Sequence, residues 1–297
     1  MNQPSRNLLP RSTAPLLFFL LLLSSQLLSA QAIDDDATLN SPRGALHAAF
    51  EKGNLMVALS GVEWRPGLNM AVALLETGKT ISLNVNLLAN TRYVFIAATE
   101  EEEDTDLYLR DPSGMIISED KEPDATPIIE FRTNRTGTYQ LQIHLVSSRR
   151  PRKFVALSLL RSGGRSILEG EYQEVATSFF NSVDDIKASY AEIQWQATPT
   201  QWCAFGYSLS ENEGISLIGL QPGPGPKIIA ATGSRNLRKI DLYLANETQR
   251  IVAMDNGPDA FPLIFYDSPV GASLDLRVEV ERGKTPSFLL VGILEKK

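Results

Sequence analysis

The sequence predicts a mainly β fold of two tandem, jelly-roll-like antiparallel β-sandwich domains, each preceded by an α-helix. The first supporting observation is an internal repeat, because three motifs each occur twice. They are Ile-Ala-Ala-Thr at residues 96–99 and 229–232, Asp-Leu-Tyr-Leu at 106–109 and 241–244, and Asp-x-x-Pro-Asp-Ala-x-Pro at 120–127 and 255–262. The last two pairs share an offset of 135 residues (241 − 106 and 255 − 120), and the first differs from it by two. Motifs that stay in register over this length indicate tandem duplication of one unit.

The second observation is alternation of apolar and polar residues near the end of each unit, at 138–145 and again at 273–280. A period of two buries one face and exposes the other, as in an antiparallel sheet with one solvated face. The sequence Asp-Pro-Ser-Gly at 111–114 suits a type I turn, which predicts a hairpin between 107–109 and 115–117. Further strands are expected at 81–83, 93–97, 128–131 and 154–160, with counterparts at 215–217, 228–231, 263–266 and 288–294. Roughly seven or eight short strands per unit favour a β-sandwich.

The third observation is a helical pattern at the start of each unit. Ser41 can cap a helix that has Pro42 at its first position, and the apolar residues 46, 49, 50 and 53 follow helical spacing. Residues 175, 176, 179, 180 and 183 repeat this pattern after Tyr172. Periodicity does not decide whether 55–59 and 186–190 extend these helices or form strands. Residues 222–226 (Pro-Gly-Pro-Gly-Pro) predict a loop, and 161–165 a flexible junction between the units.

The N-terminus has the pattern of a signal peptide. Arg6 and Arg11 precede an apolar run from Leu16 to Leu23, and small residues follow at 30–32. The run is shorter than the roughly 20 residues that cross a bilayer. An uncleaved anchor is the alternative. The predicted organisation is therefore a signal peptide at 1–32, a first helix and sandwich at 33–162, and a second at 163–297.

Charge and cysteine content exclude several classes of function. Without residues 1–32 the chain keeps 26 basic and 35 acidic residues, a net charge of −9. A nucleic-acid-binding surface needs a basic face, so nucleic acid is not expected as a partner. Cys203 is the only cysteine, so an intrachain disulfide is impossible. No segment after the signal peptide is long and apolar enough to predict a membrane span.

Several of these motifs together resemble the bacterial pre-peptidase C-terminal domain. They are Asp-Thr-Asp-Leu-Tyr-Leu-Arg-Asp-Pro-Ser-Gly at 104–114, the loop after Asp120, the strand 128–131 and Gly-Thr-Tyr at 137–139. The resemblance covers residues 78–160 and, with fewer matches, 213–295, where residues 245–248 replace the turn and Leu274 stands in place of Tyr139. It implies a jelly-roll-like sandwich of secreted bacterial proteins, usually appended to peptidases. There it acts in secretion, substrate attachment or maturation, and some relatives bind calcium. No peptidase accompanies it here, which weakens the case for a protease-linked role.

The acidic loops are the candidate metal site. Their residues are Asp106, Asp120 and Asp124, with the counterparts Asp241, Asp255 and Asp259. Calcium takes several carboxylate and carbonyl oxygens, which loops between strands can supply. The alternative is turn chemistry, in which each aspartate accepts backbone hydrogen bonds. No other cofactor is expected.

Other candidate residues favour ordinary structural roles. His47 and His144 are the only histidines, and no nucleophile, phosphate-loop or dinucleotide motif occurs. Trp64, Trp195 and Trp202 predict packing rather than a sugar-stacking platform. The acidic run 100–104 predicts a solvated loop tip, and its basic counterpart at 233–239 prompts the hypothesis that the two tips meet.

The expected function is that of an exported, non-catalytic binding or adhesion protein, secreted or periplasmic. Its partner would be an unidentified protein or polysaccharide of the envelope or exterior. The alternatives are a secreted glycan hydrolase with paired carboxylates and an envelope spacer without a ligand.

Overall fold

The computed structural model describes residues 40–101, 103–190, 192–196, 201–283 and 286–296. The predicted signal peptide, residues 1–32, lies outside these ranges, as do residues 33–39. Within these ranges the structures of the two halves match, because the described part of each half has one helix followed by nine strands.

The described elements have these bounds. In the first repeat they are α2 (Pro42–Ser60), β1 (Glu63–Trp64), β2 (Gly67–Glu76), β3 (Thr80–Leu87), β4 (Arg92–Thr99), β5 (Asp104–Arg110), β6 (Ile116–Asp120), β7 (Ile128–Arg132), β8 (Gly137–Ser147) and β9 (Arg152–Arg161). In the second repeat they are α3 (Glu169–Ser189), β10 (Ile193–Trp195), β11 (Trp202–Leu209), β12 (Glu213–Leu220), β13 (Gly225–Gly233), β14 (Leu237–Asn246), β15 (Ile251–Asp255), β16 (Leu263–Ser268), β17 (Leu274–Gly283) and β18 (Ser287–Lys296).

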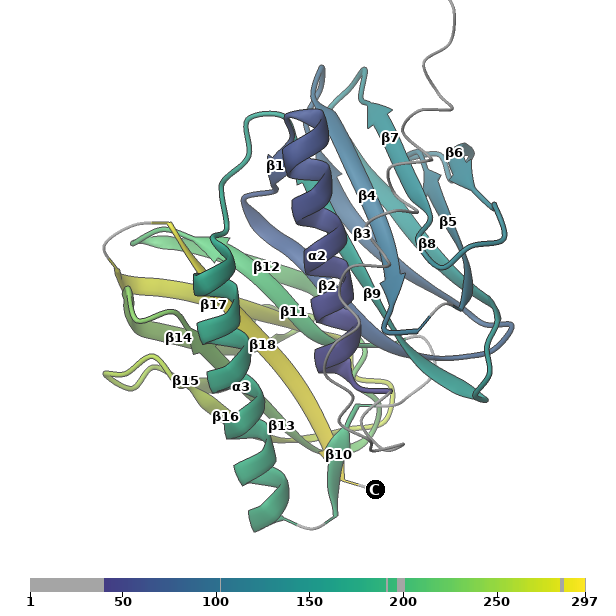
Figure 1. The fold of residues 1–297 in the computed structure, drawn as a ribbon. Helices are drawn as coiled ribbons and strands as arrows, with labels where there is room; N and C mark the ends of the chain where they lie inside the picture. Colours follow the sequence, from purple (N-terminus) through teal and green to yellow (C-terminus); the bar gives the residue numbers. More distant parts are fainter. Residues whose placement is uncertain (1–39, 102, 191, 197–200, 284–285, 297) are drawn as a thin grey trace, which may run out of the picture. The chain divides into compact units, whose positions relative to one another are not determined.

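Both repeats contribute to one central ten-stranded antiparallel sheet. Its main path runs β16-β13-β18-β11-β2-β9-β4-β7, with β1 on β9 and β10 on β18. Each repeat adds an outer four-stranded sheet, β3-β8-β5-β6 in the first and β12-β17-β14-β15 in the second (Figure 1). The prediction of a mainly β protein built from antiparallel sandwiches, each preceded by a helix, is confirmed. The jelly-roll connectivity stays a prediction.

The two repeats join where β2 pairs with β11, around an approximate twofold axis. Ala71 lies opposite Phe205, and these residues are 134 positions apart. The same offset relates the strands that flank them, since Ala71 pairs with Leu157 and Phe205 with Val291 (291 − 157). Each residue of the Ala71–Phe205 pair therefore lies opposite its own counterpart, as in the isologous interface of a twofold dimer.

The structure corrects one detail of the repeat alignment. The backbone N–H of Ala97 donates to Pro127 O, and that of Ala231 donates to Pro262 O, both at 3.1 Å. Ala97 therefore corresponds to Ala231, an offset of 134. The two Ile-Ala-Ala-Thr motifs are 133 residues apart in the sequence, so matching them letter by letter is wrong by one residue in the structure.

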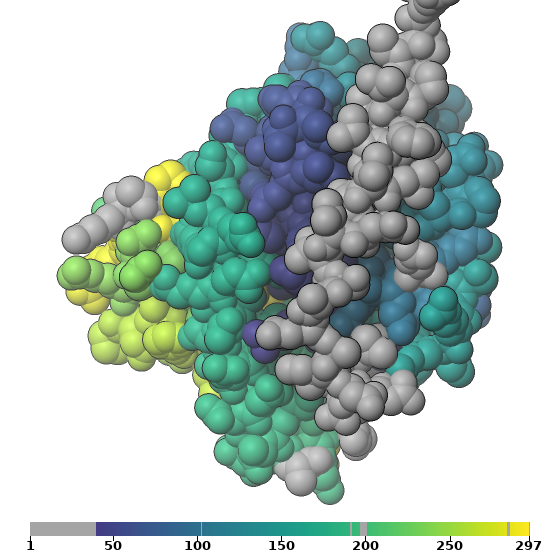
Figure 2. All heavy atoms as spheres, viewed as in Figure 1, coloured from purple at the N-terminus to yellow at the C-terminus, as the bar shows by residue number. Residues whose placement is uncertain are grey.

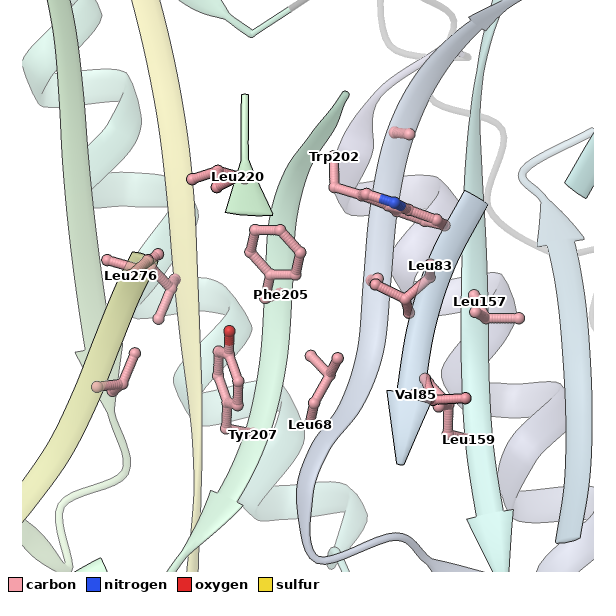
Figure 3. Close-up of a cluster of buried hydrophobic side chains, with 14 of the residues drawn as sticks. Leu68, Leu83, Val85, Leu157, Leu159, Trp202, Phe205, Tyr207, Leu220 and Leu276 are labelled. Atoms are coloured by element: carbon pink, nitrogen blue, oxygen red, sulfur yellow. The ribbon is translucent and has the colours of Figure 1, made fainter. Parts of the chain in front are cut away.

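Two layers of apolar side chains cover the central sheet on its two faces. One lies between the sheet and the two outer sheets and contains residues of both repeats. Figure 3 shows part of it, with Trp202, Phe205 and Tyr207 of β11 close to Leu68 of β2 and Leu83 of β3. The other layer lies between the sheet and the two helices. The central sheet is thus antiparallel and covered on both faces, and Thr38–Lys297 forms one compact unit.

Both predicted helices are confirmed, and the ambiguous residues 55–59 and 186–189 extend them. Ser41 is the N-cap of α2 and its Oγ accepts from Gly44 N at 2.9 Å. Gly53 is required on the buried face of α2, because a Cβ there would lie 2.3 Å from the Trp64 ring. The two helices lie side by side and meet through Phe50 and Tyr172, whose rings stack with centroids 3.8 Å apart (Figures 1 and 2).

Candidate binding surfaces

The repeated Asp-x-x-Pro-Asp-Ala-x-Pro motif forms the loop that carries the chain from the outer sheet to the central sheet. Asp120 ends β6, and its Oδ2 accepts from Ile128 N at 2.8 Å at the start of β7. Asp255 makes the same bond to Leu263 N at 2.8 Å. The other oxygen of each carboxylate accepts a second N–H, from Glu122 at 3.2 Å and from Gly257 at 3.0 Å.

The second aspartate of the motif stabilises the same loop. Asp124 Oδ1 accepts from Thr126 N, and Asp259 Oδ1 from Phe261 N, both at 2.8 Å. Their backbone carbonyls accept from Thr105 N and Ile240 N, respectively, at 3.1 Å. Four of the six candidate metal ligands therefore satisfy backbone donors of the crossover loop, which is the turn chemistry described above.

Asp106 and Asp241 lie on the outer faces of β5 and β14, and both are mostly buried. Asp106 accepts from the Tyr108 hydroxyl at 2.7 Å and lies 3.4 Å from Nδ1 of His144. Burial and the hydrogen bond to this carboxylate raise the pKa of Tyr108 to about 12. Asp241 accepts from the Tyr243 hydroxyl at 3.2 Å and lies 3.5 Å from Lys239 Nζ.

Calcium binding at these aspartates stays a prediction. In the described part of the chain, no group of three or more His, Cys, Asp or Glu side chains is arranged to hold a metal ion. Calorimetric titration of the protein with calcium, beside a melt in chelator, tests it.

The expectation of a solvated tip at residues 100–104 is wrong for three of its acids. Glu100 accepts from Ser41 N at 3.2 Å, and burial raises its pKa. Glu101 bonds to the fully buried Lys153, which lowers the pKa of Glu101. Glu103 is buried and accepts from Arg149 N at 3.0 Å. The run therefore attaches the β4–β5 connection to α2 and β9, since a buried lysine requires paired carboxylates.

The basic counterpart in the second repeat is also paired locally. Arg235 N donates to Glu174 Oε1 at 2.8 Å, and the guanidinium contacts the same carboxylate at 3.2 Å. Lys239 pairs with Glu281. Each tip thus bonds within its own repeat, and these contacts do not support the hypothesis that the tips meet.

The three tryptophans are buried, so the packing prediction is confirmed. Trp64 stacks on Phe50 at 5.4 Å, and Trp195 lies against Phe179 and Phe180 at 6.0 and 5.8 Å. Trp202 donates from Nε1 to the carbonyl of Ser82 at 2.8 Å and so links β11 to the outer sheet of the first repeat.

Strands β3 and β8 of the outer sheet of the first repeat carry amide and hydroxyl side chains on their outer side, and together with Arg110 of β5 we call this set the amide face. Gln142 is its centre, since its amide donates to Ser82 and Gln140, both at 3.0 Å, and accepts from Arg110 Nε at 2.7 Å. The face consists of Ser82, Asn84 and Asn86 on β3, Thr138, Gln140 and Gln142 on β8, and Arg110 on β5. In the second repeat, Arg277 takes the place of Gln142 and pairs with Glu279.

A second set of exposed side chains, the apolar edge, lies around β15 and β16 of the second repeat. It consists of Tyr190, Met254, Phe261 and Phe265, with exposed fractions of 51%, 55%, 56% and 56%. Phe265, opposite Ile228, lies on the helix side of the central sheet, and Met254, opposite Tyr243, lies on the outer side of the outer sheet. Tyr190 ends α3, and its ring packs edge-on against Phe265 of β16 with centroids 6.2 Å apart. β15 and β16 are terminal strands of their sheets.

The first repeat has polar residues at the equivalent positions of its edge. At an offset of 135 residues, the positions of Met254, Phe261 and Phe265 are occupied in the first repeat by Glu119, Thr126 and Glu130. Glu130 forms a two-pronged ion pair with Arg92 at 2.7 and 2.9 Å. Sequence reasoning missed both surfaces, although a residue-by-residue comparison of the two repeats contains this signal.

Comparison with known proteins assigns no family. No protein-family model matches the chain, and a search of curated proteins finds no match. Within the described residues, no helix combines the length and apolar character needed to cross a membrane.

Solved structures that resemble parts of the chain are distant. PliG, a periplasmic inhibitor of g-type lysozyme from Aeromonas hydrophila, matches with a TM-score of 0.26 and 14% identity, over 33% of this chain and 86% of its own. The PBSX exported protein XepA gives 0.25 and 8%, over 76% and 85%. The CBM22-1–CBM22-2 tandem of Paenibacillus barcinonensis Xyn10C gives 0.21 and 10%, over 76% and 91%. These likenesses are too weak to carry an argument about function.

Proposed function

We propose that this is an exported, non-catalytic binding or adhesion protein built from two domains of the pre-peptidase C-terminal type, and that it holds a partner protein at its apolar edge. The observation that carries the proposal is the difference between the two repeats. One scaffold has a charged edge in the first repeat and an aromatic edge in the second.

The contrast has a physical meaning because free sheet edges attract other strands. Proteins usually protect such edges with charges, as Glu130 and Arg92 do on β7 and β4. The second repeat has Phe265 in place of Glu130, and with Phe261 it exposes two phenylalanines by about half, while Asp267 is the exposed charge on β16. Complete burial of such a side chain contributes about 1.5–3 kcal/mol, so covering several of them at once stabilises a complex.

Support for the non-catalytic part comes from the reactive side chains. Four candidate aspartates bond to backbone donors of the crossover loops, Asp106 contacts Tyr108 and His144, and Cys203 is fully buried. Export is supported by the signal-peptide pattern of residues 1–32. An assay for new reducing ends on envelope and secreted polysaccharides tests the rival hydrolase, and their release by the purified protein would contradict this part.

The test of the apolar edge uses residues that the fold already accommodates. The triple variant Met254→Glu, Phe261→Thr, Phe265→Glu installs the side chains of the first repeat at equivalent positions. The wild-type protein should retain a partner from the organism's envelope or secreted fractions, and the triple variant should lose it. Met115→Glu, at an exposed residue of the first repeat, is the matched control.

The outcome is read by comparing the variants. Retention of the same partner by the triple variant, or its loss from Met115→Glu alone, would refute the assignment to the apolar edge. Sedimentation velocity on the same proteins shows whether a second copy of the chain occupies the edge instead, which would contradict the choice of a different protein as partner.

A further inference from the structure

We infer that the amide face of the first repeat is a second binding surface, and that its ligand is an uncharged polysaccharide. This inference is independent of the apolar edge, because the two surfaces lie on different repeats. It depends on the chemistry of the groups on three neighbouring strands, β3, β8 and β5.

The first step is the composition of β3, which is an edge strand of the outer sheet. Its exposed positions carry Thr80, Ser82, Asn84 and Asn86, and the strand contains no charged residue. Edge strands are usually protected by charge, and asparagine is disfavoured in strands. On β3 the edge is covered by other side chains instead of charge, because Trp202 Nε1 donates to Ser82 O at 2.8 Å and Arg65 donates to Asn86 O at 3.2 Å. Strand propensity, however, does not explain Asn84 and Asn86.

The second step is that hydrogen bonds hold these polar side chains in place. Asn86 accepts from Thr138 at 2.8 Å, and Gln142 links Ser82, Gln140 and Arg110 at 2.7–3.0 Å. Gln140 and Gln142 of β8 are half-buried, and hydrogen bonds with their neighbours hold both side chains. A ligand that binds there meets groups already in position, which reduces the entropy lost on binding.

The third step is the match between the groups and the ligand. A sugar hydroxyl both donates and accepts hydrogen bonds, and so do amides and hydroxyls, whereas carboxylates only accept and ammonium groups only donate. Arg110 is the only cation of the face, and it donates to Gln142 and to the carbonyl of Gly114. Because Arg110 already has hydrogen-bond partners in the protein, a neutral ligand that covers the face does not leave this charge unpaired.

The second repeat provides the internal comparison. Its residues equivalent to Asn84, Gln140 and Gln142 are Ile218, Asp275 and Arg277. Arg277 pairs with Glu279, and Asp275 accepts from Gln249 at 2.6 Å. The same strands can therefore fold with ion pairs and an exposed isoleucine, so the fold alone does not demand the amides of the first repeat.

The experiment is affinity electrophoresis of the full chain in gels that contain hydroxyethyl cellulose, laminarin or, as the acidic comparison, alginate. At least one neutral polysaccharide should retard the wild-type protein, and alginate should not. The double variant Asn84→Ala, Gln142→Ala should reduce the affinity about tenfold or more. Arg277→Ala, at the position equivalent to Gln142, should leave it unchanged.

A second variant distinguishes a loss of binding from a loss of folding. Asn84→Asp keeps the size of an exposed side chain and adds one charge, so it should weaken retardation with an unchanged circular dichroism spectrum. Absence of retardation by both neutral polysaccharides, equal retardation by alginate, or wild-type behaviour of the double variant would overturn the inference. None of these results bears on the apolar edge, which the partner-retention assay tests separately.

Discussion

At the scale of single residues, the aspartates of the two crossover loops show what the duplicated motif preserves. Asp120 and Asp255 each accept two backbone N–H groups, and one of these belongs to the first residue of the next strand. The sequence repeat could identify these residues as important. It could not distinguish backbone acceptors from metal ligands, because both roles use carboxylates in loops.

Asp255→Asn tests the structural role of this carboxylate. The amide keeps one acceptor and turns an N–H donor toward a backbone donor, which should reduce the free energy of unfolding by about 1–3 kcal/mol. Asp120→Asn should have a similar cost, because it makes the equivalent bonds. Asp267→Asn, an exposed position, serves as the control. Urea denaturation measures all three, and an unaffected Asp255→Asn protein would contradict the role.

Cys203 gives a second test at this scale. The residue is fully buried on β11 beside the seam, and burial raises the pKa of its thiol. The native protein should therefore react with a thiol reagent such as DTNB only as fast as β11 opens, whereas the protein in 6 M guanidinium should react at once. Rapid, complete labelling of the native protein would show that the seam is open in solution.

At the scale of elements, the sequence predicted strands with one wet face, such as β8 and β17, and also strands of the central sheet that are buried on both faces, such as β9 and β18. β8 and β17 alternate regularly, and the structure buries the predicted side. β2 and β11, which the helices cover on one face and the outer sheets on the other, were missed. Their sequences are continuous apolar runs without a period, which do not distinguish strand from helix.

The connection between the repeats shows a similar limit. The composition of residues 161–165 predicted flexibility, yet Arg165 bonds to Trp64 through its backbone and to Glu213 through its guanidinium at 2.8 and 2.9 Å. One long side chain fixes the segment, and composition does not reveal such a partner.

The Arg165–Glu213 pair predicts a specific dependence of stability on pH. The hydrogen bond from Arg165 lowers the pKa of Glu213 to about 2, below its ordinary value of 4.5. Because the pKa is lower in the folded than in the unfolded state, the ionised Glu213 stabilises the native protein. This contribution is complete above about pH 4.5 and is lost as the pH falls toward 2. Glu213→Gln should lower Tm at pH 7, and its difference from the wild type should shrink below pH 4. A Tm difference that is constant from pH 7 to 3 would contradict this assignment.

At the scale of the whole molecule, the duplication accounts for the architecture. Two copies of one unit pair through β2 and β11 about an approximate twofold axis, and the core between the central and outer sheets contains residues of both. The sequence offsets predicted two similar units. They could not predict the shared sheet, because the pairing depends on long-range contacts between β2 and β11.

The shared sheet predicts that the two repeats unfold together. Trp64 and Trp195 lie at matching positions in the two repeats, so each can serve as a local fluorescence probe once the other two tryptophans are replaced by phenylalanine. In each single-tryptophan protein, the fluorescence midpoint in urea should coincide with the circular dichroism midpoint, because opening one repeat would expose the apolar seam of the other. A Trp64 signal that changes before the loss of β structure, with the Trp195 signal following it, would instead show that the seam separates and that each repeat is stable alone.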